Sequence, residues 1–290
     1  MDDYRETRAA SRLRTALAGA DTVIAPLCLT PLQARLTESL GFRAGYLSGG
    51  ALGYELAVSE ALLTLTELTE AARRITARSE LPLIVDGGVG FGDPVHMVRT
   101  IREIEATGAA GIEIEDQVAP KRVSHHRGIE HLVSTGAMED RIRAAVDARR
   151  DPDFVVVART GAVRNESFEA AVERCLAYGD AGADLVMLMP SNDEEWAQAA
   201  QRVPVPVATI AAMDARSPDA WRSLGWRLVI DPFTAHTVAV DAMRAAHAAY
   251  QRDGDTGVPL ARRFAVYREF SDLAGLGEFY ELEDRTTERH

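Results

Sequence analysis

The sequence predicts an α/β protein built as a (β/α)8 barrel, also called a TIM barrel. Eight short runs are apolar and rich in Val, Ile and Leu, as strands buried on both faces are. Amphipathic stretches such as Pro94–Thr107 and Ser167–Ala181 separate these runs. No Pro/Ser-rich linker or charge block interrupts the chain, so residues 1–290 are predicted to form a single barrel domain. An open doubly wound sheet is the alternative, but no Gly-x-Gly-x-x-Gly turn follows the first strand.

The elements follow one another in the order that a barrel requires. A helix over Tyr4–Leu17 is predicted ahead of the first strand. Gly182 gives the helix Ser167–Ala181 a C-terminal stop before the sixth strand. After the eighth unit, residues 260–285 are predicted as a C-terminal helical extension, with one or two helices over Leu260–Glu283. The predicted strands are Thr22–Leu27, Ala44–Ser48, Leu83–Asp86, Gly111–Glu115, Phe154–Arg159, Leu185–Met189, Val205–Thr209 and Arg227–Asp231.

Composition excludes several classes of function. The 290 residues include 32 basic and 44 acidic ones, a net charge of −12, which argues against a nucleic-acid-binding surface. No apolar run approaches the roughly 18 residues of a membrane span, and the charged N-terminus lacks the apolar region of a signal peptide. We therefore expect a cytoplasmic protein. Two distant cysteines, Cys28 and Cys175, form no disulfide framework. Cys175 is predicted to be a buried apolar residue, and Cys28 could face the site.

Lysine usage singles out one position. Among the 32 basic residues, Lys121 is the only lysine and every other one is an arginine. A GC-rich genome explains the arginines, but the same bias should also replace a dispensable lysine. The surviving Lys121 therefore indicates a site that needs a compact ammonium rather than a planar guanidinium.

Polar residues fall at the carboxyl ends of the predicted strands, where barrels of this kind carry their chemistry. Asp86 and Glu115 end adjacent strands and suit Mg²⁺, which takes one or two carboxylates and several waters. The structural alternative, in which both cap neighbouring turns, is equally compatible with the spacing. The glycines that follow Asp86 could approach an anion or form a tight turn.

Further candidates lie on the next strand ends and loops. Arg159 ends the fifth strand, where it could bind a substrate carboxylate or phosphate, or pair with Glu115 or Asp116. Lys121, Ser124, His125 and His126 share a polar loop ahead of Gly128, which could be a mobile gate or a solvated surface loop.

Together these residues resemble the isocitrate lyase/phosphoenolpyruvate mutase superfamily, from about residue 15 to about residue 285. The resemblance implies a barrel whose last helix swaps onto a neighbouring subunit, usually in a homotetramer, and a small carboxylate substrate bound with Mg²⁺. It assigns the metal to Asp86 and Glu115, and substrate contacts to Ser48, Gly49, Gly50, Arg159, Thr209 and Arg268. We expect Lys121, Ser124, His125 and Arg159 to be catalytic, with His125, Ser124 or a water supplying the final proton. The matching segments are Tyr46–Gly50, Asp86 with Gly90–Gly92, Ile114–Gln117 with Pro120–Arg122, Ala158–Thr160 and Ala181–Asp184.

The sequence departs from the family at several catalytic positions. The metal motif Asp-x-Asp reads Asp86-Gly87-Gly88, and the gate Lys-Arg-Cys-Gly-His reads Lys121-Arg122-Val123-Ser124-His125. Losing a positioned acid or base typically costs about 10²–10⁴ in rate, so the (methyl)isocitrate reaction is not expected here. Family Glu, Asn and Arg positions are occupied by Met189, Thr209 and Thr237.

Three hypotheses follow. The first is a divergent Mg²⁺-dependent lyase that cleaves a C–C bond of a small 2-oxo or 2-hydroxy acid through an enolate, by retro-aldol reaction or decarboxylation. The second is P–C bond chemistry, as in phosphonomutases or phosphonopyruvate hydrolases, which Ser124 favours and Val123 disfavours. The third is an altered barrel that binds a ligand or runs a new non-lyase reaction.

Overall fold

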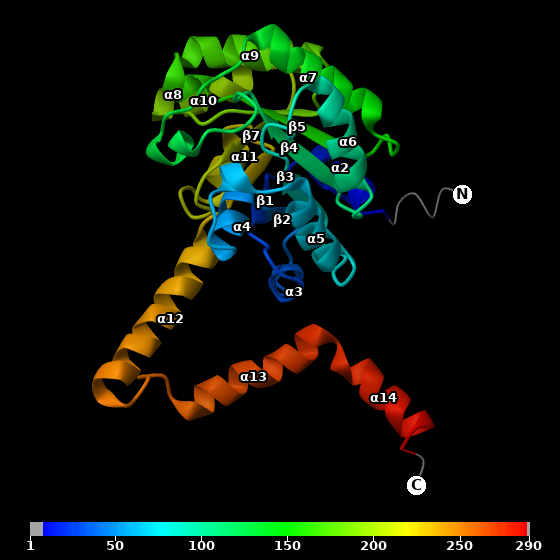
Figure 1. Ribbon diagram of the computed structural model, residues 1–290, viewed down its shortest axis with the longest axis vertical. Coiled ribbons are helices and arrows are strands. Elements are labelled where there is room, and N and C mark those ends of the chain that lie inside the picture. The colour runs from blue at the N-terminus through cyan, green and yellow to red at the C-terminus, as the bar shows by residue number, and fades with distance from the viewer. Residues whose placement is uncertain (1–7, 289–290) are drawn as a thin grey trace.

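A computed structural model describes residues 8–288 and has eight parallel strands arranged as a barrel (Figure 1). The strand order is β1-β8-β7-β6-β5-β4-β3-β2. The two ends of this order meet where Leu27 bridges Tyr46 in parallel and the Cys28 N–H donates to the Tyr46 carbonyl at 2.8 Å. The strands are β1 Val23–Pro26, β2 Gly45–Leu47, β3 Leu83–Asp86, β4 Gly111–Glu115, β5 Val155–Arg159, β6 Leu185–Met187, β7 Val207–Ile210 and β8 Leu228–Asp231.

Helices surround the strands and close one end of the barrel (Figure 1). Helix α2 contributes Leu13, Ala16 and Leu17 to the apolar cluster inside the barrel, and its Arg14 binds the start of β5 and Asp184. The helices are α2 Ala9–Ala18, α3 Pro31–Ser39, α4 Gly49–Glu55, α5 Leu65–Thr76, α6 Pro94–Glu105, α7 Thr135–Ala148, α8 Ala162–Asn165, α9 Phe168–Asp180, α10 Asp193–Arg202, α11 Pro218–Ser223, α12 Thr234–Asp253, α13 Leu260–Ala274 and α14 Leu276–Thr286, with 3₁₀ turns η1 Glu60–Leu62 and η2 Val123–Arg127.

Side chains alternate between two apolar layers, as the two-residue period of a strand requires. Ile84, Val157 and Ala208 belong to the cluster inside the barrel. Val85 and Val207 belong to the larger cluster between the strands and the helices. This alternation decides which polar side chain at a strand end faces the barrel mouth.

The predicted strands are confirmed, with shorter ends that have local causes. Strand β6 ends at Met187 rather than Met189. Strand β7 begins at Val207 rather than Val205, because Pro206 has no N–H to donate to the sheet, and it ends at Ile210, one residue beyond the predicted Thr209. Ser48 is not the last residue of β2 but the N-cap of α4, where its hydroxyl accepts the Ala51 N–H at 3.2 Å.

The predicted N-terminal helix is present over its described part as α2, which ends at Ala18. It begins at Ala9, and residues 4–7 of the expected Tyr4–Leu17 helix lie outside the described residues. The predicted C-terminal segment forms two helices, α13 and α14, which meet at Gly275.

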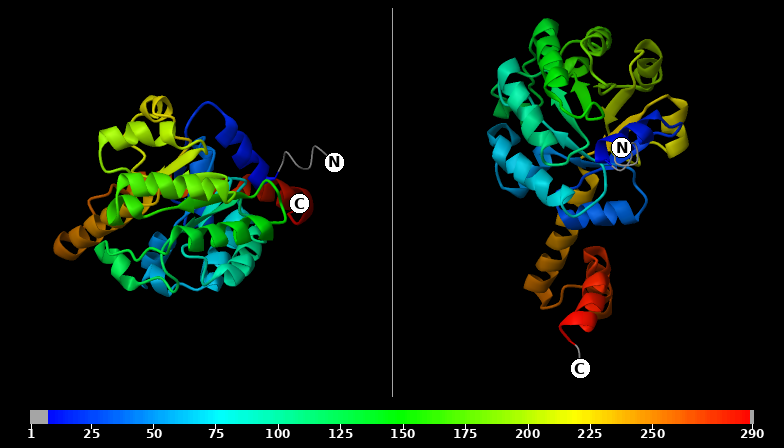
Figure 2. Two further views of the ribbon diagram at one scale, coloured as in Figure 1. Left: turned by 90° about the horizontal axis from the view of Figure 1, so that it is seen from above. Right: turned by 90° about the vertical axis from the view of Figure 1, so that its right-hand side faces the viewer.

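The C-terminal helices form an arm that leaves the barrel. Helix α12 projects away from it, and α13 returns beside α3 (Figures 1 and 2). None of the described residues of α12, α13 or α14 is buried. Asp231 at the end of β8 anchors the arm by accepting the N–H groups of Phe233 and Thr234 at 3.0 and 2.9 Å and the Thr234 hydroxyl at 2.6 Å. Within residues 8–288, no helix is long and apolar enough to cross a membrane.

Candidate active site

Charged side chains gather at the carboxyl ends of β3, β4 and β5. Asp86, Glu115 and Arg159 lie on the strand faces that point into the barrel, where Glu115 is in register with Arg159 and Asp86 with Glu113. Their side chains are nearly buried, with exposures of 2% for Glu115 and 16% for Arg159. The structure therefore brings the predicted metal carboxylates and the predicted substrate arginine to one place.

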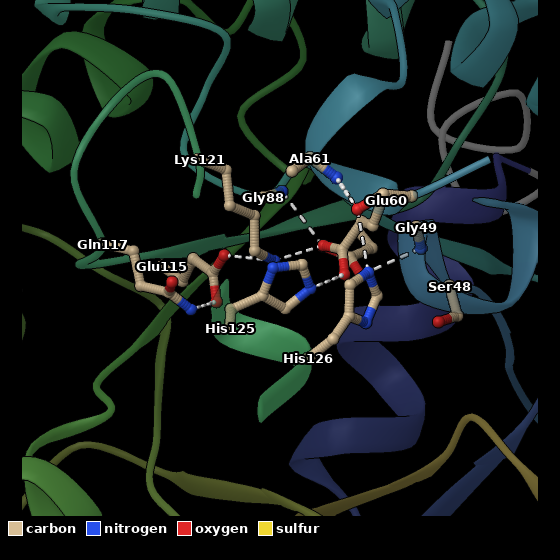
Figure 3. Close-up of polar contacts among 12 residues, drawn as sticks. Ser48, Gly49, Glu60, Ala61, Gly88, Glu115, Gln117, Lys121, His125 and His126 are labelled. Carbon is tan, nitrogen blue, oxygen red and sulfur yellow. Dashed lines mark hydrogen bonds and ion pairs between the residues drawn. The ribbon is translucent and has the colours of Figure 1, made fainter. Parts of the chain in front are cut away.

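Lys121 lies between two carboxylates of this cluster. Its ammonium pairs with Glu115 Oε1 at 2.6 Å and donates a hydrogen bond to Glu60 Oε1, and the Lys121 side chain is only 8% exposed (Figure 3). Burial opposes the charged form, but Glu115 and Glu60 together hold the pKa of Lys121 above its usual value. The ammonium of Lys121, the only lysine of the chain, thus bridges the loops after β2 and β4.

Two histidines of the 3₁₀ turn η2 complete this bridge. His125 Nε2 lies 3.3 Å from Glu60 Oε2, and this hydrogen bond raises the pKa of His125. His126 Nε2 lies 2.8 Å from Ser59 Oγ, and its Nδ1 lies 3.2 Å from the Tyr54 hydroxyl. The loop after β4 is therefore docked onto the loop after β2 by side chains predicted to form a gate.

Asp86 is the carboxylate of the cluster that fits a divalent cation. Its oxygens accept the backbone N–H groups of Gly49 and Gly88 at 2.9 and 3.0 Å, and no Lys, Arg or His of residues 8–288 lies within 4 Å. Burial, with the negative charge of Glu60, raises its pKa. A cation would bind this carboxylate directly, which no basic side chain of residues 8–288 does, and oxygen donors are what Mg²⁺ prefers.

Few protein ligands are available for that cation. Within the described residues, no three His, Cys, Asp or Glu side chains converge as a metal cluster, and Glu115 already pairs with Lys121. Asp86 with Glu115 is still sufficient for Mg²⁺, which commonly takes one or two carboxylates and fills its other positions with water and substrate.

Arg159 has unused hydrogen-bonding capacity. Its guanidinium lies 3.6 Å from Glu115, 3.8 Å from Glu113 and 4.0 Å from Glu130, all beyond hydrogen-bond length. No side-chain hydrogen bond from Arg159 reaches another residue of the described chain. Although burial opposes the charge, Glu115 and Glu113 keep the pKa of Arg159 well above its usual value. The planar donor fork is therefore charged and free to bind a ligand carboxylate.

Two acidic residues of this region were not predicted from the sequence. Glu113 is fully buried below the cluster, where it accepts the Tyr46 hydroxyl at 2.6 Å, and burial raises its pKa to about 8. Its two-residue spacing from Glu115 was a usable signal, because both side chains must face the same side of β4. Glu60 had no comparable signal, since it sits in a 3₁₀ turn far from the other residues in sequence.

Of the remaining predicted site residues, some lie near the charged cluster and others do not. Gly49 and Gly50 begin α4 beside Asp86 and Glu60, and Ser124 lies in η2. Thr209 pairs in register with Val229 of the outer layer, while its neighbours Ala208 and Ile210 face the barrel interior. Arg268 is exposed on α13. Within one chain, the structure does not bring Thr209 or Arg268 to the cluster.

Neither cysteine belongs to the charged cluster. Cys28 is buried, and burial raises its pKa to about 11, so it is not a reactive thiolate at neutral pH. Cys175 is fully buried in α9, as predicted.

Known proteins resemble this chain in sequence and in fold. The family model described as phosphoenolpyruvate phosphomutase matches residues 13–251. The 2-methylisocitrate lyase of Aeropyrum pernix is 37% identical over 99% of this chain and 94% of its own, and the 2,3-dimethylmalate lyase of Eubacterium barkeri is 35% identical over 94% and 96%. A solved phosphonopyruvate hydrolase in complex with oxalate and Mg²⁺ superposes with a TM-score of 0.84 at 29% identity, covering 97% of this chain and all of that one.

These matches extend over nearly the whole chain and include the segments that carry Asp86, Glu115 and Arg159. The chain therefore belongs to the phosphoenolpyruvate phosphomutase family, within the superfamily of that mutase and isocitrate lyase, and its lyase relatives place it with the carbon–carbon lyases of that superfamily.

Proposed function

We propose that the protein is a Mg²⁺-dependent lyase that cleaves a C–C bond of a small 2-oxo or 2-hydroxy acid through an enolate. The observation that carries the proposal is the nearly buried Arg159 guanidinium with no side-chain hydrogen bond to the described residues, near the carboxylate of Asp86, which has no ion-pair partner among them. One group suits a ligand carboxylate, and the other suits a cation that the same ligand would share.

Each residue of the cluster then has a part in the reaction. Arg159 binds the substrate carboxylate. Asp86, with Glu115, would hold Mg²⁺, which when bound supplies electrophilic stabilisation of the developing enolate. When the C–C bond of a 2-hydroxy acid breaks, the hydroxyl proton passes to a water or a carboxylate of the cluster as that carbon becomes a carbonyl, and the electron pair of the bond remains on the other carbon as the enolate. His125 is suited to deliver the proton that this carbon needs, because its hydrogen bond with Glu60 favours the protonated imidazole.

Lys121 and Ser124 act at the gate in this proposal. The Lys121 ammonium holds Glu60 and Glu115 together, which closes the loop after β4 over the mouth and keeps His125 in place. Closure excludes water, so the charges inside interact more strongly and the enolate is protected from stray protonation. Ser124, beside His125 in η2, or a water is a second proton source.

The test is a calorimetric titration with oxalate, a mimic of the pyruvate enolate, with and without Mg²⁺. Oxalate is expected to bind only when Mg²⁺ is present. Asp86→Asn should abolish this Mg²⁺-dependent binding. Asp140→Asn, an exposed carboxylate on α7, is the matched control and should bind as the native protein does. Oxalate binding that ignores both Mg²⁺ and Asp86, or no binding at all, would reject the proposed function.

Cleavage of a P–C bond is the second candidate. It is favoured by the phosphomutase family model and by the likeness to a phosphonopyruvate hydrolase. Phosphonopyruvate as substrate separates the two: release of inorganic phosphate supports P–C cleavage, whereas release of pyruvate or a related oxo acid from carbon substrates alone supports the first proposal.

We also propose that the chain works as a homo-oligomer with exchanged C-terminal helices. The arm from α12 to α14 buries none of its described residues within its own chain and carries exposed Phe264, Tyr267 and Phe279. Light scattering of the full chain should give a dimer or tetramer. A mass of 31.5 kDa, that of one chain, would contradict the proposal.

A further inference from the structure

The mouth of the barrel has a charged half and an apolar half. On the charged half, the interior-facing side chains at the ends of β3, β4 and β5 are Asp86, Glu115 and Arg159. On the other half, Met189 after β6 and Ile210 at the end of β7 pack against the cluster inside the barrel and are only partly buried. Since side chains alternate along each strand, this division follows directly from the order of residues in the chain.

The apolar half begins directly beside the arginine of the site. Arg159 is in register with Met187 of β6, and the Thr160 N–H donates to the Met187 carbonyl at 2.9 Å. Met189 comes two residues after Met187 on the same face, about 7 Å further along the chain. A ligand whose carboxylate binds Arg159 can therefore reach Met189 with its next few atoms.

The strand ends of the apolar half offer no partner for a charged ligand group. The segments that end these strands contain no Lys, Arg or His, over residues 187–192, 208–215 and 230–235. The basic residues that follow have other partners, since Arg216 pairs with Asp193 and His236 Nδ1 lies 3.8 Å from Glu55. Asp231 already accepts hydrogen bonds from the start of the arm and from the loop after β7. Burying a charge without a partner is costly, so an uncharged group is favoured here.

The charged side of the mouth is closed to the rest of the ligand. Lys121 joins Glu60 to Glu115 there and bridges the two loops (Figure 3). The cavity of about 350 Å³ beside this bridge is lined by Glu60, Asp86 and Lys121, whereas Arg159 is not among its lining residues. A ligand held by Arg159 would have to cross the bridge to enter that cavity. Its second half therefore lies over the apolar half of the mouth.

We propose that the substrate carries a single carboxylate, and that its second half is uncharged and apolar and lies against Met189 and Ile210. The proposal rests on the proposed function, which places the reacting carboxylate at Arg159. A 4-hydroxy-2-oxo acid with an alkyl or aryl tail meets both requirements, because its oxo-acid end suits the charged half and its tail suits the apolar half.

Cleavage of such an acid balances with the residues of the site. The C3–C4 bond breaks, the C4 hydroxyl proton passes to a water or a carboxylate of the cluster, and C4 becomes the carbonyl carbon of an apolar aldehyde or ketone. The electron pair of the bond stays on C3 as the enolate of a short 2-oxo acid, and His125 supplies the proton that C3 takes up.

Calorimetry with two oxamates of equal size tests the proposal. N-(3-methylbutyl)oxamate and N-(2-carboxyethyl)oxamate share the oxalate-like end and differ only in whether the tail ends in two methyl groups or in a carboxylate. With Mg²⁺ present, the native protein is expected to bind the methylbutyl compound at least about tenfold more tightly, the ratio that burial of two methyl groups gives.

Two variants alter the apolar half in different ways. Met189→Lys should reverse the preference, because the added ammonium can pair with the carboxylate tail. Ile210→Thr keeps a β-branched side chain in β7 and should lower the ratio to about threefold or less, since it removes apolar contact. Leu188→Met is the control, because Leu188 faces the helices rather than the mouth, and it should keep the native ratio. Oxalate should bind all three variants as it binds the native protein.

The outcomes separate this proposal from the proposed function. If oxalate binds with Mg²⁺ but the native protein binds both oxamates equally or prefers the carboxylate tail, this proposal alone is overturned. A native preference that survives both Met189→Lys and Ile210→Thr also overturns it. If oxalate itself does not bind, the proposed function fails and this proposal fails with it.

Discussion

Replacing Lys121 with Met is expected to lower the free energy of unfolding by about 3–5 kcal/mol, the usual cost of removing one partner from a buried ion pair. The side chain of Lys121 is 8% exposed, and those of Glu60 and Glu115 are 13% and 2% exposed. Methionine nearly matches the volume of lysine, so the loss reports the charge rather than a cavity. Both carboxylates would remain buried without the ammonium between them.

Denaturant titration and thermal unfolding measure this change. A chain of this size shifts its melting temperature by about 2 °C per kcal/mol, so a fall of about 6–10 °C is expected. Because the chain has no second lysine, the comparison variant is Arg74→Met, whose exposed pair with Glu70 should contribute about 1 kcal/mol or less. A Lys121→Met protein as stable as Arg74→Met would refute the assignment of Lys121 as the buried bridge.

Three other predictions concern separate parts of the molecule. Lys121→Arg should stay folded but lose about 10²–10⁴ in turnover in an oxo-acid release assay, because the guanidinium cannot occupy the place of the ammonium between two carboxylates; native turnover would contradict this. Asp231→Asn should cost about 2–3 kcal/mol at pH 7. Burial opposes the charge of Asp231, but hydrogen bonds from Thr234 and nearby backbone N–H groups outweigh it and lower the pKa of Asp231. Its contribution is therefore present above the unfolded-state pKa of about 3.9 and is lost as pH falls from there through the lower folded-state pKa. Urea titrations from pH 3 to 7 should show the difference between native and variant shrinking at the acid end. Gly53→Ala would place a Cβ atom 2.8 Å from the Glu60 backbone nitrogen, so oxalate binding should weaken, whereas Gly136→Ala, with nothing within 4 Å, should bind as the native protein does.

The barrel could be predicted because each of its strands is a continuous apolar run, a pattern set by burial on both faces. The errors in the strands are confined to their ends, where Pro206 limits pairing and Ser48 caps a helix. The alternation of side chains along β7 explains why Thr209 lies away from the cluster. The family resemblance suggested a substrate contact for Thr209, but Thr209 is in register with Val229 and its side chain therefore faces the surrounding helices.

The candidate site was only partly predictable. Asp86, Glu115 and Arg159 come at strand ends, and the barrel geometry alone brings strand ends together. Glu60 comes from a 3₁₀ turn, so its approach to the site depends on packing between elements far apart in sequence. Sequence spacing carries no information about that packing.

The bridge formed by Lys121 between Glu60 and Glu115 has a consequence for ionic strength. A loop held shut by apolar contacts closes more firmly as salt rises, whereas this loop is held by charges that separate into water when it opens. Dissolved ions screen the separated charges more than the buried ones, so salt favours the open form. Ligand escape from this protein should therefore accelerate with salt, and the rate of release reports how firmly a single ammonium closes the site.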